Sequence, residues 1–206
     1  MTRVKVCGIT NAADALLAAE AGADALGLVF AASPRRVSPQ AAAQIVARLP
    51  PLLTVVGVFC DQPVEEVAAI AAGVPLGAVQ LHGVEPADAC RRLPCKVIKR
   101  FNVFENDTAD ALRRRMEGYR VSAYLLDPGA GSGRSFDWKI ARGLPGPLIV
   151  SGGLHAGNVG EVIRLLRPYA VDVSSGVEAA PGRKDRAKVV AFVQAVREAD
   201  GSVGNG

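Results

Sequence analysis

Short β-branched runs alternate with Ala-rich amphipathic segments along the whole chain. The apolar runs predict eight strands, at residues 3–7, 24–30, 53–59, 77–81, 95–100, 121–127, 147–151 and 170–174. The segments that follow them predict eight helices, roughly at residues 11–21, 38–48, 63–73, 86–93, 107–116, 137–142, 156–166 and 185–199. Ser38-Pro39 supports one helix start, because serine caps helices and proline favours the first turn.

The strict alternation of strand and helix favours a parallel sheet. Eight units spaced by about 25 residues favour a sheet closed into a barrel, at the short end of the usual length for that fold. We therefore expect an α/β protein with a single-domain (β/α)8 TIM barrel over residues 1–200 and a frayed tail at 201–206. A doubly wound open sheet is the alternative. It would usually have fewer strands and a Gly-rich turn after the first one, where this chain has Cys7-Gly8-Ile9-Thr10-Asn11.

Composition narrows the class of protein. No stretch approaches the roughly 20 apolar residues needed to span a bilayer, and the N-terminus lacks the apolar core of a signal peptide. We therefore expect a soluble, cytoplasmic protein without a membrane partner. The four cysteines form neither a C-x-x-C pair nor a zinc pattern, which indicates reduced thiols and no metal site. The net charge of +4 is mild, and the run at 113–115 has no interleaved aromatic residues, so no nucleic-acid partner is expected.

Two successive strands end in small-residue turns. Residues 147–150 run into Ser151-Gly152-Gly153, and residues 171–173 run into Ser174-Ser175-Gly176. Such turns expose backbone N–H groups, which bind phosphate. In an eightfold barrel, the loops after the last two strands are where phosphates bind. Gly152, Gly153, Ser174, Ser175 and Gly176 are therefore candidate phosphate ligands, and we expect a phosphorylated small molecule as the partner.

Polar residues also end other predicted strands. Because catalytic groups of such barrels sit at the carboxyl ends of the strands, these residues are candidates for the active site. Side chains alternate between the two faces of a strand, which places Cys7 with Lys5 and Asp172 with Ser174 on the inner face. Each residue alone has an ordinary structural explanation, and their convergence is what favours chemistry. The set comprises Cys7, Gln80, His82, Asp127 and Asp172, with Arg35 and Arg36 in the loop after the second strand.

The chain resembles the phosphoribosylanthranilate isomerases of the tryptophan pathway. No single matching segment is decisive, but together they are specific, and they occur in order from residue 4 to about residue 185. They are Lys5–Thr10, Ala21–Gly27, Ser33–Arg35, Val56–Phe59, Val79–Gly83, Leu125–Asp127, Gly131–Trp138, Ser151–Leu154 and Val171–Glu178 with Pro181-Gly182.

The resemblance implies an Amadori rearrangement without any metal or organic cofactor. Asp127 would be the general acid that protonates the ribose ring oxygen, and Cys7 would be the general base that removes the C2′ proton. An acid of this kind needs a raised carboxyl pKa, and a thiol base needs a pKa below about 8.5. Independently of the resemblance, we expect Lys5, two residues away on the same face, to lower the pKa of Cys7 electrostatically. The two small-residue loops would bind the phosphate, and Asp172 would bind a ribose hydroxyl, with Gln80 and His82 also contacting the substrate.

Several alternatives stay open. The loop at 31–36 is one residue shorter than the family pattern, so either Arg35 or Arg36 could meet the anthranilate carboxylate; the spacing from Pro34 favours Arg35. The histidine-pathway isomerase would carry Asp in place of Cys7. A non-catalytic phosphosugar-binding barrel would need neither Cys7 nor Asp127. The sequence leaves open whether the protein is a monomer or a homodimer.

Overall fold

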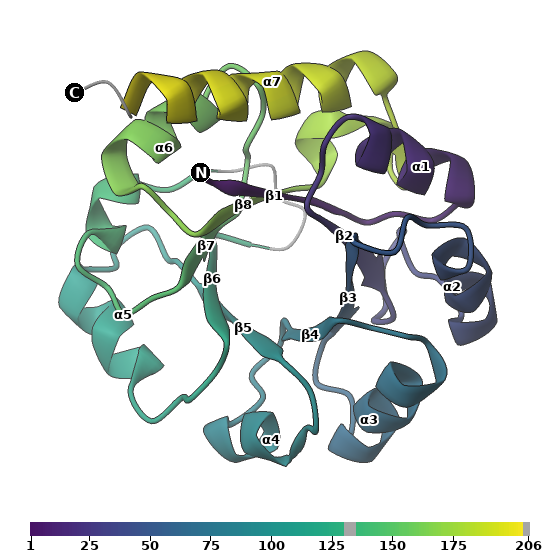
Figure 1. Ribbon diagram of the computed structural model, residues 1–206. Helices are drawn as coiled ribbons and strands as arrows, with labels where there is room; N and C mark the ends of the chain where they lie inside the picture. Colours follow the sequence, from purple (N-terminus) through teal and green to yellow (C-terminus); the bar gives the residue numbers. More distant parts are fainter. Residues whose placement is uncertain (130–134, 204–206) are drawn as a thin grey trace.

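Eight parallel strands close into a barrel (Figure 1). The computed structural model describes residues 1–129 and 135–203. The strands follow one another in chain order around the barrel, and the eighth pairs with the first. This confirms the closed barrel and excludes the open sheet. The strands are β1 (Arg3–Cys7), β2 (Ala25–Val29), β3 (Thr54–Phe59), β4 (Ala78–Leu81), β5 (Val97–Asn102), β6 (Ala123–Asp127), β7 (Leu148–Val150) and β8 (Ala170–Val173).

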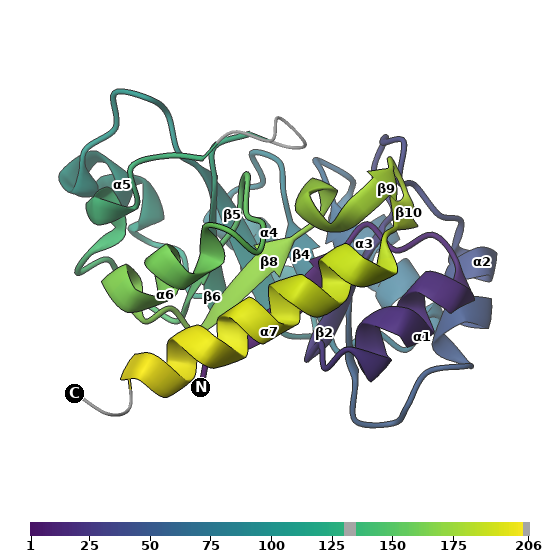
Figure 2. The same ribbon diagram turned by 90° about the horizontal axis from the view of Figure 1, so that it is seen from above.

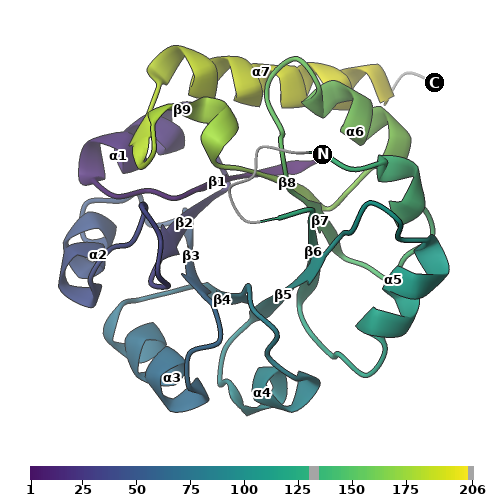
Figure 3. The same cartoon turned by 180° about the vertical axis from the view of Figure 1, so that it is seen from behind.

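Helices surround the barrel, as predicted. They are α1 (Ala12–Glu20), α2 (Pro39–Val46), α3 (Val64–Gly73), α4 (Ala87–Arg92), α5 (Ala109–Met116), α6 (Val159–Leu166) and α7 (Arg186–Val203). Ser38 caps α2 by accepting a hydrogen bond from the Ala41 backbone, as the Ser-Pro signal indicated. The long α7 lies along the outside of the barrel against α6 and α1 (Figure 3). No helix in the described part of the chain is both long and apolar enough to span a membrane.

Four local features differ from the sequence-based expectation. Strand β5 lies two residues later than the predicted 95–100, and the predicted helix at 137–142 is the short 3-10 helix η1 (Trp138–Ala141). Helix α7 continues three residues into the segment expected to be a frayed tail, whose last residues, 204–206, lie outside the described residues. After β8 comes an unpredicted 3-10 turn, η2 (Ser175–Val177), and then the antiparallel hairpin of β9 (Glu178–Ala180) and β10 (Arg183–Lys184).

Alternation along the strands sorts the side chains into two layers. Val4 and Val6 of β1 point outward into the main core beneath the helices, whereas Lys5 and Cys7 point into the barrel. The lower barrel interior is filled by small and branched side chains: Val56, Ala78, Ile98, Ala123, Leu125, Ile149 and Ala170. The hairpin of β9 and β10 lies at the end of the barrel toward which β8 points (Figure 2). That end is therefore where the polar strand ends gather.

Candidate active site

Cys7 ends β1 inside the barrel, where its side chain is 9 % exposed. Burial raises the pKa of the Cys7 thiol, and the positive charge of Lys5 opposes that rise. Lys5 is itself held by a buried ion pair, since its Nζ lies 2.8 Å from Oδ1 of Asp172. Burial disfavours the charge on Lys5, but Asp172 and Cys7 together raise its pKa, so Lys5 stays positive. The predicted electrostatic link from Lys5 to Cys7 is present, but it is weaker than the effect of burial. The pKa of the thiol is therefore raised, and not lowered as expected for a thiol base.

Asp127 ends β6, three strands from Cys7 around the barrel through β7 and β8. Its side chain is 9 % exposed, and Oδ1 accepts a hydrogen bond from the Gly129 backbone at 2.7 Å. Nη2 of Arg100, from β5, lies 3.8 Å from the same Oδ1. Arg100 also donates from Nη2 to Oδ1 of Asn102 at 2.7 Å and to the carbonyl of Asp127 at 3.4 Å. A guanidinium therefore borders the predicted acid.

The two small-residue loops form one pocket of about 40 Å³. Gly152 and Gly153 adopt φ values of +88° and +61°, which favour glycine. Gly176 comes so close to the carbonyl of Leu154 that a Cβ there would collide with it, so glycine lets the two loops meet. The pocket is lined by all five predicted phosphate ligands and by both predicted carboxylates: Asp127, Gly129, Ser151, Gly152, Gly153, Leu154, Asp172, Val173, Ser174, Ser175 and Gly176.

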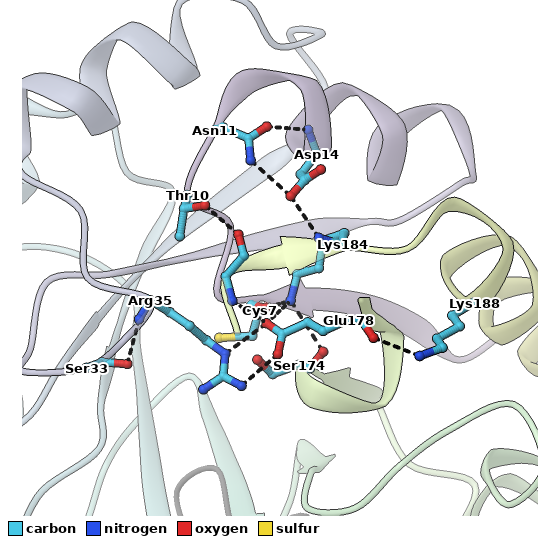
Figure 4. Close-up of polar contacts among 11 residues, drawn as sticks. Cys7, Thr10, Asn11, Asp14, Ser33, Arg35, Ser174, Glu178, Lys184 and Lys188 are labelled. Atoms are coloured by element: carbon cyan, nitrogen blue, oxygen red, sulfur yellow. Dashed lines mark hydrogen bonds and ion pairs between the residues drawn. The ribbon is translucent and has the colours of Figure 1, made fainter. Parts of the chain in front are cut away.

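Arg35 is already engaged within the protein. Its Nε and Nη2 donate to the two carboxylate oxygens of Glu178, at 2.8 and 2.7 Å (Figure 4). The stem of Arg35 crosses directly over Gly8, where a side chain would clash with it. Arg36 has an exposed side chain, and its backbone pairs with Val29. Of the two arginines, Arg35 is therefore the one that reaches the barrel mouth.

Gln80 and His82 lie on the inner face of β4 and directly after it, as predicted. The amide nitrogen of Gln80 lies 3.1 Å from Nδ1 of His82. Because the amide nitrogen of Gln80 can only donate, Nδ1 of His82 accepts the hydrogen bond, and the imidazole proton is on Nε2. Burial, followed by the charge of Arg100, lowers the pKa of His82 to about 4. His82 is therefore neutral near pH 7. Nε2 of His82 and Oε1 of Gln80 are both buried, and neither has a hydrogen-bond partner among the described residues.

Comparison with known proteins assigns the chain to a family. The family model of N-(5′-phosphoribosyl)anthranilate (PRA) isomerase matches residues 4–195. The chain belongs to this family. The N-(5′-phosphoribosyl)anthranilate isomerase of Geobacter sulfurreducens is 50 % identical over 202 residues, covering 94 % of this chain and 98 % of the relative. The phosphoribosyl anthranilate isomerase of Thermotoga maritima superposes with a TM-score of 0.87 at 41 % identity, covering 96 % of this chain and 100 % of that one.

A further solved structure of the family contains a ligand. It is a phosphoribosyl anthranilate isomerase in complex with reduced 1-(o-carboxyphenylamino)-1-deoxyribulose 5-phosphate, with a TM-score of 0.86 and 40 % identity. It covers 96 % of this chain and 100 % of that one. These matches confirm the family resemblance found in the sequence. Part of the resembling segment Gly131–Trp138, at 131–134, lies outside the described residues.

Three charged residues at the barrel mouth received no role in the sequence analysis. Arg100 is the last residue of the predicted strand at 95–100 and received no role there; in the structure it lies within β5 and points into the barrel with Ile98 and Asn102. Glu178 lies in a segment that carries the family resemblance but received no role there. Lys184 contacts the Cys7 backbone across 177 residues of sequence, for which no local pattern gives a signal.

Proposed function

We propose that this chain converts N-(5′-phosphoribosyl)anthranilate into 1-(2-carboxyphenylamino)-1-deoxyribulose 5-phosphate, an isomerisation in tryptophan biosynthesis. The observation that carries the proposal is the position of Asp127, which lines the phosphate pocket and shares the barrel mouth with Cys7. A substrate phosphate held by the loops after β7 and β8 would place its ribose between these two residues.

In the proposed reaction, Asp127 protonates the ribose ring oxygen. The C1′–O bond breaks, and the nitrogen lone pair forms an iminium. Cys7, as thiolate, removes the C2′ proton, and those electrons form an enolamine between C1′ and C2′. A proton then adds to C1′ while the 2′-hydroxyl loses its proton, which leaves the ketone. Two protons are gained and two are lost, so the reaction is a pure isomerisation.

The environment of Cys7 predicts how the activity depends on pH. Because burial raises the pKa of the thiol, the thiolate becomes more abundant as pH increases beyond neutrality. Positive neighbours limit this effect, since Lys5 lies beside the thiol and Lys184 bonds the Cys7 carbonyl at 2.6 Å. The ratio kcat/KM should therefore rise on the alkaline side, with an inflection above the ordinary cysteine value.

The substrate carboxylate would meet Arg35. Glu178 occupies the edge of the guanidinium formed by Nε and Nη2, and the edge formed by Nη1 and Nη2 remains for a second carboxylate. Arg100 supplies a second guanidinium near the mouth, on the side of Asp127. Asp172, bound to Lys5 through Oδ1, lines the pocket where a ribose hydroxyl would lie.

The test is loss of turnover in two conservative variants. Cys7→Ser leaves a hydroxyl that is too weakly acidic to act as the base, and Asp127→Asn removes the transferable proton. Each should lower kcat by about 10²–10⁴-fold, measured as the decrease in substrate fluorescence. Cys90→Ser, at another buried cysteine, is the control and should retain activity close to that of the parent. Parent-like turnover by Cys7→Ser would refute the assignment of the base.

A further inference from the structure

The buried carboxylate of Glu178 joins the β9–β10 hairpin to the loop after β2 at the barrel mouth. Its side chain is 5 % exposed and accepts four hydrogen bonds. Two come from Arg35, one from Nζ of Lys184 at 2.9 Å, and one from the Gly182 backbone at 3.2 Å. Burial disfavours ionisation, but the bonds from Arg35 and Lys184 outweigh it and lower the pKa of Glu178 to about 2. The carboxylate is therefore charged throughout the physiological range.

The geometry of the pair determines what Arg35 offers to a ligand. A guanidinium has a side edge, Nε with Nη2, and an end edge, Nη1 with Nη2, each able to bind one carboxylate in bidentate fashion. Glu178 takes the side edge, so the plane of the guanidinium is fixed next to Cys7 (Figure 4). An unpaired arginine samples many rotamers, and ordering it on substrate binding would cost free energy.

Lys184 extends the same hydrogen-bond network to β1, the strand that carries Cys7. Its Nζ donates to the carbonyl of Cys7 at 2.6 Å and to the carbonyl of Ser174 at 3.3 Å, as well as to Glu178. One ammonium therefore bonds the end of β1, the phosphate loop after β8 and the carboxylate of Glu178. The hairpin that carries these two residues is fastened separately, by Thr10 to the Gly182 carbonyl at 2.6 Å and by Asp14 to the Lys184 backbone at 2.9 Å.

We propose that Glu178 is a positioning residue for substrate binding. It holds Arg35 so that the end edge of the guanidinium faces the anthranilate carboxylate, at a fixed position relative to Cys7 and the phosphate loop. This inference rests on the proposed function. It concerns a residue that touches no substrate atom and acts through Arg35, so its effect belongs in KM and depends on the carboxylate of the substrate.

The first experiment replaces Glu178 by glutamine, which keeps the shape and removes the charge and the second oxygen acceptor. Glu178→Gln should raise KM for N-(5′-phosphoribosyl)anthranilate about tenfold or more, with a smaller change in kcat. With the aniline analogue, which lacks the ring carboxylate, parent and variant should have KM values within about twofold of each other. A merely structural role would change KM for both substrates alike, and that result would overturn the proposal.

The control is Lys188→Met. Nζ of Lys188 donates to the backbone carbonyl of Glu178 at 2.8 Å, so this variant loses a contact to the same residue and leaves the carboxylate network intact. Its KM should match that of the parent. A KM rise in Lys188→Met equal to that in Glu178→Gln would show that a loosened hairpin is sufficient, and would overturn the role of the carboxylate.

A second variant covers the case in which Glu178→Gln alone fails to fold, since it leaves Lys184 charged and buried. Glu178→Gln combined with Lys184→Met removes both charges. Because Lys184 also donates to the Ser174 carbonyl in the phosphate loop, KM should rise for both substrates, and it should rise about tenfold more for the substrate that carries the carboxylate. Equal rises for the two substrates would refute the proposal. Parent protein without turnover would refute the proposed function itself, whereas an active parent with an unaffected Glu178→Gln variant would refute only the positioning role.

Discussion

His82 should make the protein lose stability in mild acid. In the folded state its imidazole is buried beside Arg100 and accepts from the Gln80 amide, and its pKa falls from 6.5 to about 4. Unfolding exposes the ring to water and restores the ordinary pKa of about 6.5. Between these two values the unfolded chain binds a proton that the folded chain does not. Acid therefore favours the unfolded state, and the contribution of His82 to stability is present above about pH 6.5 and lost toward about pH 4.

The magnitude follows from the two pKa values. At about pH 5 the ring is about 97 % protonated in the unfolded chain and about 10 % in the folded one, which corresponds to about 2 kcal/mol. At about pH 7.5 both forms are neutral and the difference is close to zero. At lower pH, where His82 is protonated in both states, the total loss approaches about 3 kcal/mol, which is a substantial part of the stability of a typical domain.

The assay is urea unfolding at about pH 7.5 and about pH 5, followed by circular dichroism. The parent should lose about 2 kcal/mol more than His82→Gln does over this interval. His155→Gln makes the same exchange at an exposed histidine and should keep the pH dependence of the parent. Equal losses in the parent and His82→Gln would show that the folded imidazole titrates normally and would refute the reasoning. The same neutrality predicts no histidine inflection near pH 6.5 in kcat/KM.

Two further variants test the binding loops. Arg35→Ala should reduce kcat/KM by at least about tenfold more than Arg36→Ala, because only Arg35 lies at the mouth; a larger loss in Arg36→Ala would reverse the assignment. Gly176→Ala should raise KM about tenfold, because its Cβ would push the carbonyl of Leu154 out of the phosphate pocket; an unchanged KM would exclude that pocket. Gly73→Ala is the matched control, since a Cβ there meets no atom within 4 Å.

The barrel could be predicted because side chains alternate along each strand between the helix layer and the barrel interior. Val4 and Val6 face the helices while Lys5 and Cys7 face the interior, so β1 was correct to the residue. β5 was placed two residues early, because its sequence, Val-Ile-Lys-Arg-Phe-Asn, ends in polar side chains that resemble a loop. These polar residues are inside the strand because the barrel mouth accommodates them.

Almost nothing in the sequence pattern indicates the hairpin after β8. Residues 178–184 read Glu-Ala-Ala-Pro-Gly-Arg-Lys, without alternating apolar positions, and only Pro181-Gly182 indicated a turn. The strands of this hairpin are three and two residues long, and among the described residues they pair only with each other. The hairpin is held by side chains from distant loops, as in the hydrogen bond from Thr10 to the Gly182 carbonyl. Local propensity could not predict it, because its stability comes from contacts far apart in sequence.

The same separation explains why the role of Arg35 was incomplete when derived from sequence. Arg35 and Glu178 are 143 residues apart, and sequence order does not reveal that one edge of the guanidinium proposed to bind the substrate is already bound to Glu178. The pairing changes what a substitution measures. Arg35→Ala removes the substrate contact and also deprives the buried carboxylate of Glu178 of two donors, so its cost combines both losses. Glu178→Gln keeps Arg35 but weakens the contact that holds its guanidinium in place. A double-mutant cycle that combines the two variants separates substrate binding by Arg35 from the positioning of Arg35 by Glu178.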